Sequence, residues 1–388
     1  MENISWTVIL LFCLTFNFGW SSLACAQTPD HEVQLLNELT TADGPSGFEG
    51  PVRELFEQQM RAVGAEISTD GLGSVIATIQ GTSARPRVMI DAHLDEVGLM
   101  VRYITPEAYI KVQTLGGWLG LNMVDQRWTI LTSRGPLPAV SGTLDAHIST
   151  TQDQKWAIDP ENVFLDVGAK SRADAEAMGV RPGDPIAPYS PFTELAHHRY
   201  AAKAWDDRIG LAMMIEAAKR LKEQGTKTPN TLIFVGTVEE EPGMRGAMTA
   251  TNEVKPDLGI AIEVGIAADY PGTNPNEAEE RLGAGPGIFL YDHSMLPNLK
   301  LRDFFERVAQ QNNIPLQTDL VQGYGEDGSD IQKYANGRPA INFVVPTRYT
   351  HANTGIIDRA DFDHGVLLLM DVLERLDARQ VNEISSFR

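Results

Sequence analysis

Three consecutive glutamates, Glu239, Glu240 and Glu241, follow an apolar run at residues 232–235. The run has the character of a strand buried on both faces of a parallel sheet, and such a strand delivers the residues after its carboxyl end into the crevice where open α/β folds bind ligands. An acidic triplet by itself is ordinarily a solvated loop. At the end of a buried strand it is also a candidate for meeting a cation, with one carboxylate binding a metal ion and another moving protons.

Other histidines and carboxylates stand at equivalent places, directly after apolar segments or at the start of a helical pattern. They are His93 and Asp95 after residues 87–92, Asp206 at the start of residues 206–222, Glu263 at the end of residues 258–263, and His351 after residues 340–345. Because the carboxyl ends of parallel strands meet at one edge of a sheet, we expect these side chains to converge.

Two imidazoles and several carboxylates, with no thiolate, form a ligand set for divalent metals, with zinc first and cobalt or manganese next. The carboxylates suffice for two ions bridged by one of them, an arrangement common in aminopeptidases and other hydrolases. Considered alone, each residue has an ordinary structural alternative. His93 beside Asp95 is typical of a hydrogen-bonded strand end, Asp206 of a helix N-cap, and His351 of a loop.

The elements that must position these residues alternate between strand and helix. Strands are predicted at residues 75–79, 87–92, 231–238, 258–263 and 340–345, and helices at residues 31–39, 52–63, 206–222, 299–311, 330–335 and 362–376. This alternation indicates an α/β fold with a doubly wound, mostly parallel sheet and helices on both faces.

The sequence pattern changes between residues 101 and 200, where short runs of strand-forming residues alternate with turns that contain Gly and Pro. Only residues 172–178 have a helical pattern there. We expect a small, β-barrel-like domain inserted into the catalytic α/β domain, which is thereby divided into residues 27–100 and 201–388.

Residues 1–26 form a separate segment. Residues 4–20 are almost uninterruptedly apolar, and Ala24, Cys25 and Ala26 have the small-x-small pattern of a signal-peptidase site. We expect a signal peptide cleaved near Ala26 and export to the periplasm or the exterior, although Glu2 and no basic residue precedes the apolar run. An uncleaved anchor and lipidation at Cys25 are the alternatives. Cleavage would remove Cys25 and Cys13, the two cysteines of the chain, which suits an oxidising compartment.

Composition excludes some classes of partner. The chain has 388 residues, 43% of them hydrophobic, and a formal net charge of −20. Nucleic acids and anionic membranes require clusters of Lys and Arg, and the sequence has no sustained basic run. We therefore expect neither as a partner, and no membrane contact of the mature chain unless Cys25 is lipidated.

Five segments together resemble the tetrahedral aminopeptidase family, a group of co-catalytic zinc metallopeptidases of the MH clan. They are residues 45–49 (PSGFE), 91–98 (DAHLDEVG), 203–210 (KAWDDRIG), 237–246 (TVEEEPGMRG) and 348–351 (RYTH). The family includes glutamyl aminopeptidases and members once named endoglucanases. The resemblance covers essentially all of the chain after residue 26 and implies the zinc-exopeptidase fold.

The resemblance implies two divalent ions per subunit. The ligands would be His93 and Glu263 for one ion, Glu241 and His351 for the other, and Asp206 bridging both. Glu240 would be the general base that takes a proton from the attacking water and passes it to the leaving amine. Asp95 would hydrogen-bond the ring of His93 and fix its tautomer. Glu239 would have no part in the reaction.

The implied function is a metal-dependent aminopeptidase that acts on peptides and assembles, through residues 101–200, into dimers or a twelve-subunit particle. A related two-zinc carboxypeptidase or N-acyl amidohydrolase is the alternative, and it would need a cationic clamp such as Arg208, Arg245 or Arg348. A glycoside hydrolase would need only a carboxylate pair. A secreted binding protein with an inactive site is opposed by the intact ligand positions.

Three departures from the family pattern stand in this sequence. Glu263 occupies a position where the family has Asp, and Pro242 follows the paired glutamates where a small apolar residue is usual. The glutamate expected shortly after His351 is absent from residues 352–355. Related two-zinc families use either acid, so we expect Glu263 to keep the ligand role. We expect Pro242 to alter the glutamate loop and the missing glutamate to change the substrate contacts of the loop after His351.

Overall fold

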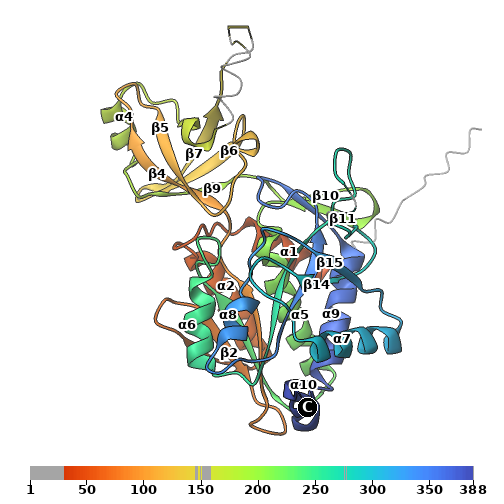
Figure 1. Cartoon of the computed structure of the whole chain (residues 1–388). Helices are drawn as coiled ribbons and strands as arrows, with labels where there is room; N and C mark the ends of the chain where they lie inside the picture. The colour runs from red at the N-terminus through yellow and green to blue at the C-terminus, as the bar shows by residue number, and fades with distance from the viewer. Residues whose placement is uncertain are drawn as a thin grey trace, which may run out of the picture.

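The computed structural model describes residues 30–144, 147–148, 150, 159–274, 276 and 278–387. It has two parts, a large α/β body and a small β-barrel that stands to one side of it (Figure 1). The chain enters the barrel shortly after β3 (Arg87–His93) and returns to the body by β11 (Arg199–Ala202). The barrel is therefore inserted directly beside the strand that carries His93.

The body is built on an eight-stranded sheet in the order β1-β2-β12-β3-β13-β16-β14-β15. Its four central strands, β12, β3, β13 and β16, are parallel to one another, whereas β2 and β14 run antiparallel to their central neighbours. The remaining bounds are β1 (Glu66–Thr69), β2 (Val75–Ile79), β12 (Thr231–Thr237), β13 (Leu258–Ile266), β14 (Gly287–Tyr291), β15 (Gln317–Leu320) and β16 (Ala340–Thr347). The shared direction brings the carboxyl ends of the four central strands to one edge.

Helices cover both faces of this sheet, and alternate residues of β12 enter different cores. Leu232 and Phe234 pack in the main core with α1, α2, α5, α7, α9 and α10, whereas Ile233 and Val235 pack against α6 and α8. This is why the central strands consist mainly of apolar residues. The helices are α1 (His31–Thr41), α2 (Gly50–Val63), α5 (Trp205–Glu223), α6 (Arg245–Val254), α7 (Leu299–Asn312), α8 (Gly328–Lys333), α9 (Arg359–Leu373) and α10 (Ala378–Ser385).

The inserted part is a closed barrel in the order β4-β5-β8-β7-β6-β9. Its strands are β4 (Gly98–Ile104), β5 (Ile110–Leu115), β6 (Arg127–Thr132), β7 (Gly135–Gly142), β8 (Phe164–Asp166) and β9 (Pro185–Pro188), and α4 (Arg172–Ala177) lies between the last two. A separate core containing Leu99, Trp128 and Ile186 fills it. A third, small sheet pairs β11 with β10 (Thr193–Glu194) and β17 (Gly355–Asp358).

The predicted fold class, a doubly wound α/β sheet with an inserted barrel, is confirmed. The prediction of one closing helix over residues 362–376 was wrong. The helix ends at Leu373, and the carboxylate of Asp377 then accepts a hydrogen bond from the backbone N–H of Gln380 and caps a further helix, α10. The proposed leader, with Cys13 and Cys25, lies outside the described residues. Within the described ranges, no helix is both long enough and apolar enough to cross a membrane.

Candidate metal centre

The carboxyl ends of three central strands place candidate residues at one level of the sheet. His93, the last residue of β3, pairs in register with Thr237, the last residue of β12. Ala261 of β13 pairs with Asp91 of β3, so Glu263 lies level with His93. Parallel register thus converts three distant sequence positions into neighbours.

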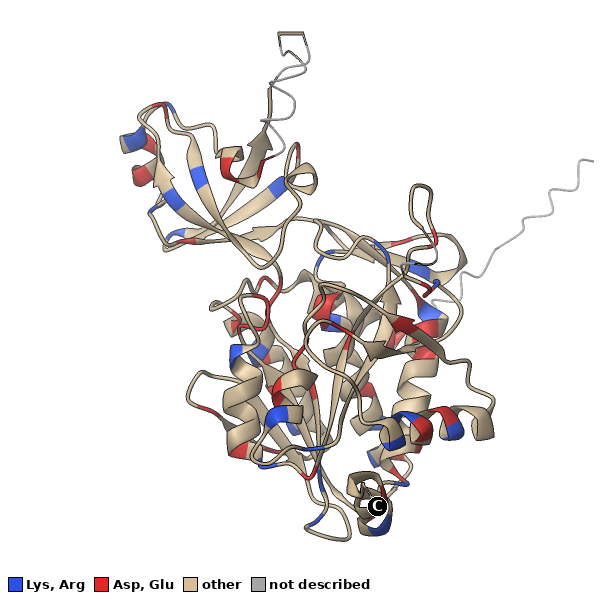
Figure 2. Ribbon diagram, viewed as in Figure 1, with Lys and Arg blue, Asp and Glu red and all other residues tan. Residues whose placement is uncertain are grey.

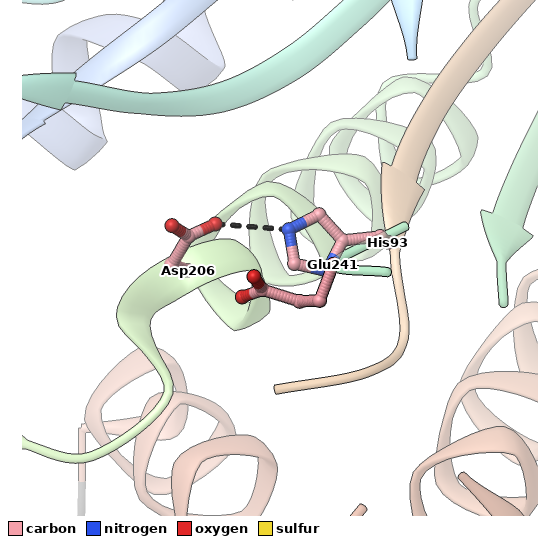
Figure 3. Close-up of side chains that lie close together, drawn as sticks. All are labelled: His93, Asp206 and Glu241. Atoms are coloured by element: carbon pink, nitrogen blue, oxygen red, sulfur yellow. Dashed lines mark hydrogen bonds and ion pairs between the residues drawn. The ribbon is translucent and has the colours of Figure 1, made fainter. Parts of the chain in front are cut away.

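Asp206 lies between two histidine rings. Its Oδ1 is 2.9 Å from Nε2 of His93, and its Oδ2 is 3.3 Å from Nε2 of His351. Figure 3 shows Asp206 reaching the ring of His93 from the first turn of α5. The backbone at Asp206 is extended rather than helical, with φ −81° and ψ 106°. The alternative role of Asp206 as an N-cap is not what the structure shows, because it is Asp207 that accepts a hydrogen bond, 3.1 Å long, from the backbone N–H of Gly210.

Glu241 and Glu263 complete the cluster on opposite sides. Oε2 of Glu241 lies 3.6 Å from Nε2 of His351, and Oε2 of Glu263 lies 3.7 Å from Nε2 of His93. One ligand atom each from His93, Asp206 and Glu241 lies within 4.8 Å of the others. The second oxygens of Glu241 and Glu263 are buried and have no hydrogen-bond partner within the described ranges. Unpartnered anionic oxygens beside two imidazoles fit a divalent cation, which would replace those missing bonds.

Protons bind these ligands when no ion is bound. Burial opposes protonation of His351, but the carboxylates of Glu241 and Asp206 outweigh it and raise the pKa of His351 to about 10. For Glu241 the effect of burial has the other sign. Burial raises the pKa of this carboxyl group to about 8, against the opposing effect of His351. For His93, the nearby Glu263 and Asp206 raise the pKa well above its usual value despite burial. A metal ion would therefore compete with protons for this site.

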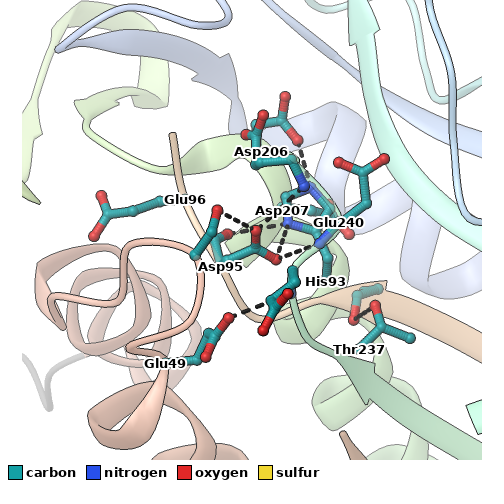
Figure 4. Close-up of polar contacts among 12 residues, drawn as sticks. Glu49, His93, Asp95, Glu96, Asp206, Asp207, Thr237 and Glu240 are labelled. Carbon is teal, nitrogen blue, oxygen red and sulfur yellow. Dashed lines mark hydrogen bonds and ion pairs between the residues drawn. The ribbon is translucent and has the colours of Figure 1, made fainter. Parts of the chain in front are cut away.

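Asp95 holds together the loops that carry the ligands. Its carboxylate accepts hydrogen bonds from Ser46 Oγ (2.7 Å) and from the backbone N–H groups of Glu240 (3.0 Å) and Glu241 (3.2 Å). The nearer acceptor for Nδ1 of His93 is the backbone carbonyl of Asp95, at 3.0 Å, whereas its carboxylate is 3.6 Å away. Figure 4 shows Asp95 in the middle of these contacts. Asp95 thus orients both the ring of His93 and the glutamate loop.

The members of the glutamate triplet have different surroundings. Glu239 forms an ion pair with Arg245 at 2.9 Å. The side chain of Glu240 forms no ion pair with the residues described here. Burial together with Asp327 and Glu241 raises its pKa well above its usual value, against the opposing effect of His93. Glu241 points to His351. The three residues are therefore chemically distinct despite their identical side chains.

The barrel reaches the centre through two glycines that sequence reasoning missed. The carbonyl oxygen of Gly117 is 2.8 Å from Nδ1 of His351, which leaves Nε2 to face Asp206. A Cβ on Gly116, which has φ +81°, would lie 2.6 Å from Oε2 of Glu241. The Gly-Gly pair before Trp118 was the available signal, but nothing in the sequence connects it to residues more than a hundred positions away.

A group of buried acids behind the ligands was also missed. Asp327 accepts a hydrogen bond of 2.6 Å from Thr237 Oγ1, and Asp91, Asp207 and Glu326 lie nearby with unpartnered oxygens. Acidic residues also recur on the loops at this end of the body in Figure 2. Asp207 is adjacent to Asp206 in sequence, whereas residues 321–327 form a loop with no helix or strand pattern to draw attention to it.

The three arginines considered for a substrate-carboxylate clamp are all engaged. Arg208 is fully buried and donates to the carbonyl oxygens of Leu39 and Ala42. Arg245 pairs with Glu239, and Arg348 pairs with Asp269 through two hydrogen bonds of 2.5 and 2.8 Å. These arginines therefore have partners within the protein.

Comparisons with known proteins point to one family. Residues 73–368 match the family described as M42 glutamyl aminopeptidase. Lysyl aminopeptidase of Pyrococcus furiosus is 35% identical over 350 residues, which cover 88% of this chain and 97% of the relative. The crystal structure of a TET aminopeptidase from a marine sediment Thaumarchaeota archaeon superposes with a TM-score of 0.89 at 38% identity and covers 92% of this chain and 99% of that one. The Pyrococcus horikoshii TET1 peptidase, which can assemble into a tetrahedron or a large octahedral shell, has a TM-score of 0.80 at 27% identity, covering 89% and 100%.

Proposed function

The chain belongs to the M42 glutamyl aminopeptidase family and is a metal-dependent aminopeptidase, and from this premise we propose that it removes amino-terminal residues from peptides with two divalent ions bound at the candidate metal centre. The observation that carries the proposal is the position of Asp206, which presents one oxygen to each of two histidine rings. A carboxylate placed in this way suits a bridge between two ions.

The ligands divide into two sets around Asp206. His93 and Glu263 would hold one ion with it, and Glu241 and His351 would hold the other. Zinc is the first choice for imidazole and carboxylate ligands without thiolate, and cobalt and manganese are the alternatives. When bound, the ions would polarise the scissile carbonyl and acidify the attacking water.

Glu240 is the proposed proton carrier. Its backbone N–H is held by Asp95, so its side chain starts from a fixed point beside the ligands. The carboxylate accepts a proton from the attacking water and donates it to the nitrogen of the leaving amine, so that it returns to its starting state. Glu239 takes no part, because its carboxylate is paired with Arg245 on the outside of the loop.

The same site is less suited to a carboxypeptidase or an N-acyl amidohydrolase. Those enzymes would need a free cation for the substrate carboxylate, and Arg208, Arg245 and Arg348 already have partners. The discriminating experiment is a panel of aminoacyl anilides and of free and N-acetylated dipeptides, assayed after removal of metal and readdition of zinc, cobalt or manganese. Metal-dependent hydrolysis confined to free-amine substrates is expected. Preference for N-blocked dipeptides would contradict the proposal.

Assembly into a homo-oligomer through residues 101–200 is part of the proposal. The TET1 peptidase assembles into shells, and the barrel of this chain exposes apolar side chains that include Tyr103, Tyr109 and Val140. Exposed apolar side chains of this kind mark protein contacts when they form a patch. Light scattering of the purified protein should give a mass of at least two chains. Val140→Ser combined with Tyr103→Ser should lower that mass, and an unchanged mass would exclude these residues from the contact.

Export is also proposed, from the signal-like pattern of residues 1–26. Amino-terminal sequencing of the protein recovered from its host's periplasm or medium should begin at or near Gln27. An intact amino terminus, or a lipid on Cys25, would decide for the alternatives.

A further inference from the structure

Glu326 is a buried acid that the proposed mechanism does not use. It lies on the loop between β15 and α8, and hydrogen bonds hold this loop against two of the strands that carry the site. Tyr324 donates its phenolic O–H to the carbonyl oxygen of Val264, next to Glu263, and Asp327 accepts a hydrogen bond from Thr237 at the end of β12. The backbone N–H of Glu326 donates to Ser294 Oγ at 3.2 Å. Glu326 is therefore held between the carboxyl ends of β12 and β13.

The carboxylate of Glu326 has no partner among the residues that the structure describes. Glu326 is 0% exposed, and neither of its carboxylate oxygens forms a hydrogen bond with those residues. Burial raises its pKa well above the usual value, and the strongest further causes are the charges of Asp292, Glu240 and Asp206. All of these neighbours are acids. An ionised carboxylate buried in such surroundings has a high free energy unless a cation pairs with it.

Glu326 is not one of the proposed metal ligands. Its carboxylate makes no hydrogen bond with any of the described residues, the five proposed ligands included. The side chain nevertheless lies close enough to Glu240 and Asp206 for their charges to act on it. A cation that enters with each substrate and leaves with each product would satisfy Glu326 only during turnover, and a peptide with a free amino terminus carries such a group.

We propose that Glu326 binds the ammonium group of the substrate, as the acid that recognises a free amine beside the metal centre. This inference rests on the proposed aminopeptidase function and deepens it. The ammonium can be the α-ammonium of any free amino terminus or the ε-ammonium of an amino-terminal lysine, and the two sources share one chemistry. In either case Glu326 orients the amino-terminal residue so that its carbonyl lies within reach of Glu240.

The test compares Glu326→Gln with Glu280→Gln. Glu280 is a matched control because it is also a buried glutamate, 1% exposed, with both oxygens unpartnered, but its electrostatic neighbours are Asp319 and Asp361 rather than the site. Each purified variant is assayed for KM and kcat on leucyl and lysyl p-nitroanilides, and its metal content is measured. Glu326→Asp, which keeps the charge on a shorter side chain, is included in case Glu326→Gln does not fold.

Glu326→Gln should raise KM roughly 10- to 100-fold, as expected for loss of a hydrogen bond to a charged group, with metal content unchanged. A rise for both anilides identifies the α-ammonium, and a rise for the lysyl anilide alone identifies the ε-ammonium. Glu280→Gln should keep the wild-type KM, and Glu326→Asp should lie between wild type and Glu326→Gln. Wild-type KM in both Glu326 variants, or loss of a metal ion from either, would overturn the inference. Absence of hydrolysis by the wild-type enzyme would instead contradict the proposed function.

Discussion

Nε2 of His93 lies 2.9 Å from Oδ1 of Asp206, although 113 positions separate the two residues in the sequence. The other oxygen of the same carboxylate faces His351. This contact brings the end of a central strand to the start of α5, and the remaining candidate ligands gather around it. It is the part of the site whose removal should have the largest effect on metal binding.

Asp206→Asn should lower metal content from two ions per chain to one or none. An amide offers one neutral oxygen and an N–H₂ group, so it cannot present an anionic oxygen to each histidine ring. Metal analysis by mass spectrometry after gel filtration measures the effect. Asp125→Asn is a suitable control, because Asp125 is exposed on the barrel and its left-handed backbone also suits Asn. Two ions retained in Asp206→Asn would refute the bridging role.

Glu240→Gln should keep both ions and lose turnover by a factor of about 10²–10⁴, the usual contribution of a general base. The matched control is Glu239→Gln, one residue away, where only a partly exposed ion pair with Arg245 is lost. We expect the control to retain kcat within a few-fold of wild type. Steady-state kinetics on a leucyl anilide gives the comparison, and equal losses in the two variants would remove the special role of Glu240.

Metal uptake at pH 7 should release protons. In the metal-free site the pKa values of His351 and Glu241 are raised to about 10 and about 8, so both groups are largely protonated at pH 7. An ion must displace these protons, and metal affinity should therefore rise from pH 6 to pH 8. Calorimetric titration of the metal-free protein in buffers of different ionisation enthalpy counts the protons. Uptake without proton release would show that the ligands are already deprotonated.

Gly116→Ala should weaken the ion held by Glu241 and His351 more than the ion held by His93 and Glu263. The added Cβ would lie 2.6 Å from Oε2 of Glu241 and must displace it. Substitution at φ +81° also strains the backbone by about 1 kcal/mol. Gly135→Ala separates the two effects, because Gly135 is on the same barrel with φ +112° and has no atom within 4 Å of an added Cβ. Stepwise metal titration should show a weakened second step in Gly116→Ala alone. Equal titration curves for the two variants would mean that the contact of the added Cβ with Glu241 does not affect metal binding.

Much of the body was predictable because its signals are local. The strand that ends at His93 and the strand before Glu240 are buried on both faces, so their residues are mainly apolar, although the buried Asp91 lies within the first of them. Polar residues mark where each strand ends. The last two strands at one side of the sheet, β14 and the edge strand β15, were not predicted. Each has five residues or fewer and several partly buried residues, so burial imposes a weaker pattern on them.

The contacts that tune the site were less accessible to prediction. Asp95 was expected to bond the ring of His93. Its carbonyl oxygen is the nearer acceptor at 3.0 Å, and its carboxylate, 3.6 Å from the ring, also holds Ser46 and the backbone of the glutamate loop, which was not expected. Asp207 rather than Asp206 bonds the first turn of α5. Either of two adjacent aspartates could contact the histidine rings or bond the first turn of the helix, because their side chains are identical. Only the path of the backbone distinguishes them.

The sequence by itself determined the fold class, the chemistry of the ligand set and the edge of the sheet at which it gathers. Residue types decide which metals can bind, and hydrophobic periodicity decides which segments become central strands. The tertiary structure alone decided that Asp206 lies between two histidines, that Gly117 of the barrel contacts His351, and that Glu326 has no partner in the described part of the chain. Those relationships depend on where loops from distant segments come to rest, and loop paths are set by packing against the assembled body rather than by any repeat in the chain.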